Sequence, residues 1–390
     1  MAIFPAMNST YFDEPVDRKH TSSLKWDRYA DRDVIPLWVA DMDFRSPPEV
    51  IAALQERVAH GVFGYTRPPQ ELTEAIVKDV ADSFSWEIQR EWIVYLPGLV
   101  CGLNIAARAV GTHGDDQITF TPVYPPFFAA PRDAGRNLIQ VPLLNADNAW
   151  SIDFDALQAA ITPNTSLLLL CNPHNPVGRV FTVAELKRLA KICLAHDIAI
   201  CSDEIHNGLV LDPQVRHVPI AALAAAVAQR TITLMAPSKT YNIPGLACSF
   251  AIIPNPDLRK AFCKVMDGIV PHVNLLGYTA ALACYRDSQA WHAQLLEYLR
   301  SNRDLVEQSI AFIPELSIAH CEATYLAWID ARKLGVDDAA KFFEKGGVGL
   351  SNGIEFGLPG FVRLNFGCRR ELLEEALKRM HEVCKTLRSA

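Results

Sequence analysis

The chain has 390 residues, and half of them are hydrophobic. It carries 37 Lys and Arg against 44 Asp and Glu, which gives a formal net charge of −7. This length and apolar content exclude a disordered chain and predict a large domain with a smaller companion. The acidic balance argues against a general nucleic-acid or acidic-membrane binder, because such a protein needs a basic face.

Ten cysteines are scattered along the chain without a CxxC pair. Most of them lie in apolar runs, where a thiol behaves as a small core residue. The first 20 residues lack a basic start followed by an apolar stretch, and no window holds about 18 apolar residues in a row. We therefore expect a soluble, unexported protein of the reducing cytoplasm.

Short apolar runs alternate with amphipathic helical patterns through most of the chain. The predicted strands are 93–96, 118–120, 138–141, 167–171, 198–202, 231–236 and 248–253. A helix is predicted over 182–196, where Thr182 and Glu185 form a capping-box pattern ahead of apolar residues at helical spacing. Wholly apolar strands separated by such helices predict an α/β fold, a mostly parallel central sheet with helices on both faces.

The pattern changes near residue 285. Long charged helices are predicted over 291–312, 336–345 and 371–387, around short strands at 325–329 and 361–365. This change predicts a smaller α+β domain. We assign residues 46–284 to the large domain, and residues 1–45 and 285–390 to the small one.

The predicted strand ends carry the residues that point to chemistry, because open parallel sheets bind ligands at their carboxyl edge. Asn175, Asp203 and Lys239 each follow an apolar strand, and two further strand ends lead to Tyr124 and to a glycine turn at Gly98. This combination suits an aromatic cofactor that carries an aldehyde and a phosphate. The lysine can form a Schiff base once burial lowers its pKa, and the acid can keep the ring nitrogen protonated.

Six motifs carry a resemblance to a known family. They are WVADMDF at 38–44, GVFGY at 61–65, NPHNPVG at 172–178, SDEIH at 202–206, SKTYNIPGL at 238–246 and FVRLNFGC at 361–368. With these motifs the chain resembles the fold-type I pyridoxal-phosphate enzymes of the class I/II aminotransferase superfamily. Within that superfamily it is most similar to the branch of cystathionine β-lyases and cystalysin-like C–S lyases. The motifs run in family order and span nearly the whole chain.

The resemblance implies a cofactor site for pyridoxal 5'-phosphate in the large domain. Lys239 would hold the cofactor and then move the substrate's Cα proton. Asp203 would pair with the ring nitrogen, Asn175 with the phenolic oxygen, and Tyr124 would stack on the ring. The other implied cofactor contacts are the backbone amides of Gly98, Leu99 and Val100, the side chains of Ser238 and His206, and Tyr65 of a neighbouring subunit. Taken singly, a lysine such as Lys239 would be a surface lysine in most proteins, and the alternative for Tyr124 is an aromatic ring packed in a proline-rich loop.

The implied substrate site depends on Arg363, whose guanidinium would bind the α-carboxylate through two parallel hydrogen bonds. Asn175, Val39 and Ala40 would complete this site. The alternative for Arg363 is a strand arginine in a salt bridge, which its apolar neighbours disfavour. For a distal carboxylate, the sequence offers Arg45, Arg67 and Arg369 as possible neighbours without placing any of them.

Several positions depart from the wider aminotransferase pattern. His206 stands where many relatives have tyrosine, and histidine is typical of the C–S lyase branch. Ala247 replaces a phosphate-binding arginine, Ala236 lacks a common hydroxyl, and Val177 replaces a threonine. The phosphate site is therefore expected to depend on backbone amides, Ser238 and the partner subunit.

These residues predict a pyridoxal-phosphate C–S β-lyase that cleaves L-cystathionine or cysteine S-conjugates to a thiol, pyruvate and ammonia. Two alternatives remain open: an aminotransferase of the same fold, and a regulatory protein that binds a transcription factor. We expect a homodimer with shared active sites. We predict no metal site and no nucleic-acid or membrane partner.

Overall fold

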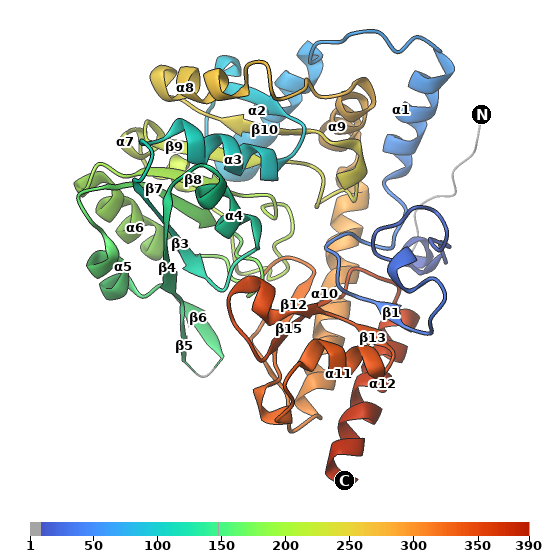
Figure 1. The fold of residues 1–390 in the computed structure, drawn as a ribbon. Coiled ribbons are helices and arrows are strands. Elements are labelled where there is room, and N and C mark those ends of the chain that lie inside the picture. The colour runs from blue at the N-terminus through green and yellow to red at the C-terminus, as the bar shows by residue number, and fades with distance from the viewer. Residues whose placement is uncertain (1–8, 147, 390) are drawn as a thin grey trace.

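The computed structural model describes residues 9–146 and 148–389. Its largest element is a seven-stranded sheet. The strands are β2 (Ile93–Leu96), β3 (Asp116–Thr121), β4 (Asn137–Pro142), β7 (Thr165–Cys171), β8 (Ala199–Asp203), β9 (Thr231–Met235) and β10 (Ser249–Ile252). They lie in the order β2-β10-β9-β8-β7-β3-β4 (Figure 1). Strand β10 is antiparallel to both of its neighbours and the other pairs are parallel, so the predicted mostly parallel sheet is confirmed.

Helices cover both faces of this sheet, as the sequence predicts. One face carries α3 (Leu99–Ala109), α4 (Pro126–Asp133) and α8 (Pro256–Met266), and the other carries α5 (Phe154–Ala160), α6 (Val183–Ala195) and α7 (Ala225–Ala228). Alternate residues of β7 explain the arrangement: Leu167 and Leu169 pack in the α3 cluster, whereas Leu168 and Leu170 pack in the α6 cluster. A strand buried on both sides therefore reads as one continuous apolar run.

The helix predicted over 182–196 is confirmed as α6, with its capping box. The Thr182 hydroxyl accepts a hydrogen bond from the Glu185 amide, and the Glu185 carboxylate accepts one from the Thr182 amide. The predicted elements did not include α1 (Pro48–Ala59), α2 (Gln70–Phe84) or α9 (Leu275–Asp287). Because α1 and α2 begin after prolines with no capping side chain, they lack the usual signal of a helix start.

A second, smaller sheet is formed by residues near the carboxyl end. Its antiparallel strands are β11 (Ser317–Ile318), β12 (Leu326–Asp330), β15 (Phe361–Asn365) and β14 (Ser351–Asn352), in that order. The surrounding helices are α10 (Gln289–Ala311), α11 (Ala339–Lys345) and α12 (Arg370–Ser389). A separate hairpin consists of β5 (Leu144–Ala146) and β6 (Ala149–Ser151).

The amino-terminal segment pairs with the part of the chain that forms the smaller sheet and its helices. Strand β1 (Ile35–Pro36) pairs in parallel with β13 (Val348–Gly349). This pairing supports the proposed division into a large domain, 46–284, and a small one, 1–45 with 285–390. None of the helices in the described ranges is long and apolar enough to cross a membrane.

Candidate active site

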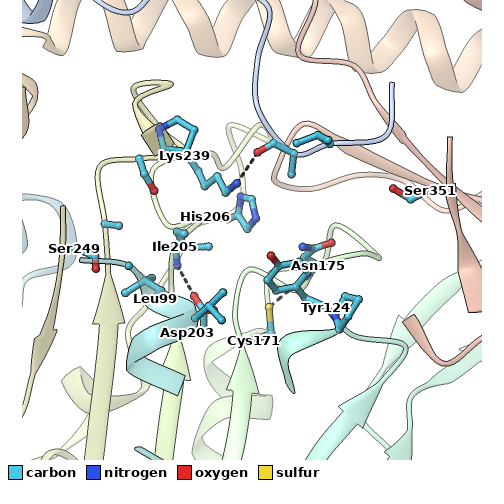
Figure 2. Close-up of a pocket in the computed structure, with 18 of the residues that line it drawn as sticks. Leu99, Tyr124, Cys171, Asn175, Asp203, Ile205, His206, Lys239, Ser249 and Ser351 are labelled. Atoms are coloured by element: carbon cyan, nitrogen blue, oxygen red, sulfur yellow. Dashed lines mark hydrogen bonds between the residues drawn. The ribbon is translucent and has the colours of Figure 1, made fainter. Parts of the chain in front are cut away.

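A cavity of about 370 Å³ lies where the carboxyl ends of β7, β8 and β9 meet strand β15 of the smaller sheet. Figure 2 shows Lys239, Asp203, Asn175 and Tyr124 around this space. The predicted site residues that line it are Val39, Ala40, Gly98, Leu99, Val100, Tyr124, Asn175, Asp203, His206, Ser238, Lys239 and Arg363. The structure therefore brings together residues that lie more than 300 positions apart in the sequence.

Asp203 is the last residue of β8, so the strand ends one residue later than the sequence predicts. It lies opposite Cys171 of β7, and one of its carboxylate oxygens accepts a hydrogen bond from the Ile205 amide at 3.1 Å. Burial raises its pKa to about 7, and the neighbouring Glu204 acts in the same direction. A nearby cation would favour the ionised form of this acid, which makes it a suitable partner for a protonated ring nitrogen.

Lys239 is partly buried, and its Nζ atom donates a hydrogen bond to the backbone oxygen of Ala40 at 2.5 Å. Burial lowers the pKa of this amine to about 8, and the positive charge of Arg363 contributes to the effect. Asp41 and Asp203 act in the opposite direction. A larger share of the amine is therefore uncharged near neutral pH than in an ordinary lysine, as a nucleophile requires.

Arg363 lies on β15 and is only 4 % exposed. Its Nη1 atom donates to Asn175 Oδ1 at 3.0 Å, and Nη2 donates to the backbone oxygen of Trp38 at 2.9 Å. Its Nε atom has no partner among the described residues, and no described carboxylate lies within ion-pair distance of the guanidinium. Burial lowers its pKa to about 10. A buried cation without an anion is costly, so the site is prepared for a carboxylate ligand.

The amino terminus of α3 also faces the cavity. Gly98 occupies the cap position and no side chain caps the helix, so the amides of Leu99 and Val100 are available to an anion. Ser238 lies nearby in the lining, together with Ser249, whose hydroxyl donates to the Leu96 oxygen. This arrangement fits a phosphate held by helix-end amides. The cavity wall contains alanine at positions 236 and 247, so neither position supplies a polar group to a phosphate.

His206 is buried beside Tyr325, with ring centroids 6.1 Å apart. Burial lowers the pKa of His206 to about 3, and the charges of Lys239 and Arg363 add to this. The imidazole is therefore neutral near pH 7. Its Nδ1 atom has no partner among the described residues, which leaves it available to a bound group.

Sequence reasoning missed the residues that fix the backbone at 39–41. The Tyr325 hydroxyl donates to the Ala40 oxygen at 2.9 Å, and Asn365 Nδ2 donates to the Val39 and Asp41 oxygens at 2.5 and 2.6 Å. Asn365 belongs to the FVRLNFGC motif, but its contacts join positions 326 residues apart. Nothing local in the sequence indicates such a contact.

An ion network holds the same segment from the other side. Arg18 pairs with Asp41 and with Asp43, each at 2.6 Å. Lys25 is fully buried, and its Nζ atom lies 2.7 Å from Asp43 Oδ2. Residues 38–43 are thus fixed on both sides, which positions the Ala40 oxygen against the reactive lysine.

Tyr65 is the one predicted site residue that does not line this chain's cavity. It lies in the loop between α1 and α2, which extends away from the body of the chain at the top of Figure 1, and its side chain is fully exposed. Val62 and Phe63 of the same loop are also exposed. The expectation that Tyr65 serves a neighbouring subunit stays a prediction.

The site is that of a fold-type I pyridoxal-phosphate enzyme, because its groups match that cofactor one by one. It offers a partly buried amine with a lowered pKa, a buried acid, and an uncapped helix end for a phosphate. A buried guanidinium with a free Nε atom remains for an amino-acid carboxylate.

The chain belongs to the aminotransferase class I and II family, which matches residues 32–380. It is 36% identical over 381 residues to the cystathionine beta-lyase PatB of Bacillus subtilis, covering 95% of this chain and 98% of that protein. Cystalysin from Treponema denticola, whose crystal structure contains pyridoxal 5'-phosphate, is 36% identical with a TM-score of 0.93, covering 96% and 99% of the two chains. The crystal structure of OvoB is 49% identical with a TM-score of 0.94 and the same coverage. These matches confirm the predicted C–S lyase branch.

Proposed function

We propose that the protein is a pyridoxal-phosphate-dependent C–S β-lyase that acts on L-cystathionine or cysteine S-conjugates. The observation that carries this proposal is the convergence of Lys239, Asp203 and Arg363 on one cavity from two separate sheets. The relatives that bear the name cystathionine beta-lyase support it. In the reaction, water and the amino acid give a thiol, pyruvate and ammonia.

Each charged group would have a defined task. Pyridoxal phosphate, when bound, supplies an electron sink for negative charge at the substrate's Cα atom. Arg363 would bind the α-carboxylate through two parallel N–H groups, which orients the Cα–H bond. Lys239 would remove the Cα proton and then donate a proton to the leaving sulfur. Asp203 would hold the proton at the ring nitrogen.

The neighbouring groups would position these three residues. The Ala40 oxygen accepts the hydrogen bond of Lys239 Nζ and fixes the direction of the amine. Asn175 receives a hydrogen bond from Arg363, so one amide connects the proposed cofactor contact with the proposed substrate contact. Tyr124 would cover the ring, and the neutral His206 would lie close to it.

We also propose a homodimer in the cytoplasm. The exposed loop with Tyr65 extends away from the body of the chain, which supports the proposal that Tyr65 contacts the active site of a neighbouring subunit. All ten cysteines are unpaired, which suits a reducing compartment. The assembly state can be measured by light scattering, and a monomeric active enzyme would contradict the shared site.

The test separates the lyase from an aminotransferase of the same fold. Purified enzyme loaded with pyridoxal phosphate is incubated with L-cystathionine, with and without an added keto acid. The lyase releases pyruvate and thiol at the same rate in both samples. An aminotransferase forms product only when the keto acid is present, and that result would overturn the proposal.

A further inference from the structure

Among the described residues, four charged side chains line the active-site cavity, and the proposed reaction uses three of them. In that reaction Lys239 and Asp203 would serve the cofactor, and Arg363 would bind the α-carboxylate; all three line the cavity. The fourth is Glu355, which has no task in bond cleavage. Its position therefore bears on the part of the substrate that varies, the substituent on sulfur.

Glu355 lies in the outer part of the cavity. It belongs to the short 3-10 turn Gly353–Phe356 and is exposed, whereas Arg363 is almost fully buried. The ring of Phe356 packs on the Arg363 guanidinium, with 4.7 Å between Cζ and the ring centroid. Glu355 influences the pKa of Arg363 but lies beyond ion-pair distance from it. The carboxylate thus remains available to a ligand that extends outward from Arg363.

Glu355 shares the cavity wall with several aromatic and apolar side chains. Trp38, Tyr124 and Phe356 line the cavity, and the exposed side chain of Leu24 lies at its edge. A carboxylate among aromatic rings is a suitable receptor for an organic cation, which gains both a charge pair and contact with ring faces.

A second cation for a distal carboxylate is missing from the described part of the wall. Arg45 lies 3.9 Å from Glu14, and Arg369 pairs with Glu371 at 3.3 Å; neither lines the cavity. Arg28 stacks on Trp38, with 4.6 Å between its Cζ atom and the ring centroid, but it does not line the cavity either. Arg67 lies in the exposed loop between α1 and α2. The described charges therefore disfavour substrates whose sulfur substituent carries only a carboxylate.

We propose that Glu355 selects cysteine S-conjugates whose sulfur substituent carries a positive charge. This inference rests on the proposed C–S lyase function and names its substrate class. L-cystathionine carries both charges in its distal part, so its ammonium group would face Glu355 while its distal carboxylate would stay in solvent.

Three cysteine conjugates of similar size test the proposal with the holoenzyme. S-(2-aminoethyl)-L-cysteine carries a distal cation, S-propyl-L-cysteine is neutral there, and S-carboxymethyl-L-cysteine carries a distal anion. We expect kcat/KM for pyruvate release to fall in that order, by about fivefold at each step, which is the upper end for a solvent-exposed charge pair. Glu355→Gln should bring the three values to within about twofold, and Glu355→Lys should reverse the order.

A charge-matched control is Glu374→Lys on α12, which does not line the cavity and should preserve the wild-type order. Equal kcat/KM values for the three conjugates in the wild type would overturn the inference and leave the lyase function standing. A preference of the wild type for the anionic conjugate would also overturn the inference if Arg67→Gln removes that preference. This result would mean that Arg67 from a neighbouring subunit provides the cation at the cavity. Failure to release pyruvate from any of the three conjugates would overturn this inference, and failure to release it from L-cystathionine as well would overturn the proposed function.

Discussion

Replacing Arg363 with lysine tests the substrate site most sharply, because the charge is kept and the geometry is lost. The guanidinium has two N–H groups that can meet the α-carboxylate in parallel, whereas an ammonium group is a single point donor. In this structure the guanidinium also holds Asn175 and the Trp38 oxygen. Lysine at this position cannot keep these contacts and also form a paired bond to the substrate.

The expected loss of kcat/KM in Arg363→Lys is calculated as the loss of one hydrogen bond between charged groups. Such a bond contributes about 1.5–3 kcal/mol, which corresponds to a fall of about 10- to 150-fold in kcat/KM. The assay is the initial rate of pyruvate release over a range of substrate concentrations. The visible absorbance of the bound cofactor shows in the same sample that Arg363→Lys is folded and loaded.

The matched control is Arg332→Lys. Arg332 lies at the end of the same small sheet, pairs with Asp330 at 2.6 Å and packs on Phe361, but it is largely exposed and outside the cavity. We expect it to change kcat/KM by less than about twofold. If Arg363→Lys keeps kcat/KM within threefold of the wild type, the α-carboxylate binds elsewhere and the assignment of Arg363 is wrong.

Three further predictions concern the titratable groups around the site. In the apoprotein the pKa of Asp203 is raised from 3.8 to about 7, so its ionisation opposes folding as pH rises from about 4 to about 7. Asp203→Asn should therefore stabilise the apoprotein at pH 8 by up to about 4 kcal/mol and change its Tm little at pH 4; an equal gain at both pH values would contradict the burial of this charge. The lowered pKa of Lys239, about 8, predicts that apoprotein captures pyridoxal phosphate about tenfold faster at pH 9 than at pH 7 in stopped-flow absorbance, and a rate that still rises steeply above pH 10 would be inconsistent with it. Fully buried Glu204 pairs with His217 at 2.8 Å, so His217→Phe should lower the urea-measured free energy of unfolding by about 3–5 kcal/mol, and a loss below 1 kcal/mol would show that the pair contributes little.

The sequence predicts the large sheet well because its strands are short and apolar on both faces. Leu167–Leu170 illustrate this: each residue is buried, on alternating sides of the sheet. The direction of β10 could not be predicted in this way, because an antiparallel strand buried on both faces has the same composition as a parallel one.

The candidate site likewise contains residues that the sequence predicts and residues that it does not predict. Asp203 and Lys239 were predictable because each lies at or just beyond the end of an apolar strand. Tyr325 and Asn365 were not, because their importance depends on long-range hydrogen bonds to the Val39 and Ala40 oxygens. The outer position of Glu355 depends on how the small sheet meets the large one, which no local pattern encodes.

The most direct test of the central claim is a product balance over many turnovers. Wild-type enzyme is given a limiting amount of L-cystathionine without any keto acid, and pyruvate, ammonia and thiol are measured at completion. The proposed β-lyase gives one of each per substrate consumed, and Lys239→Ala gives none. Complete consumption of the substrate without pyruvate, or full pyruvate release by Lys239→Ala, would contradict the account.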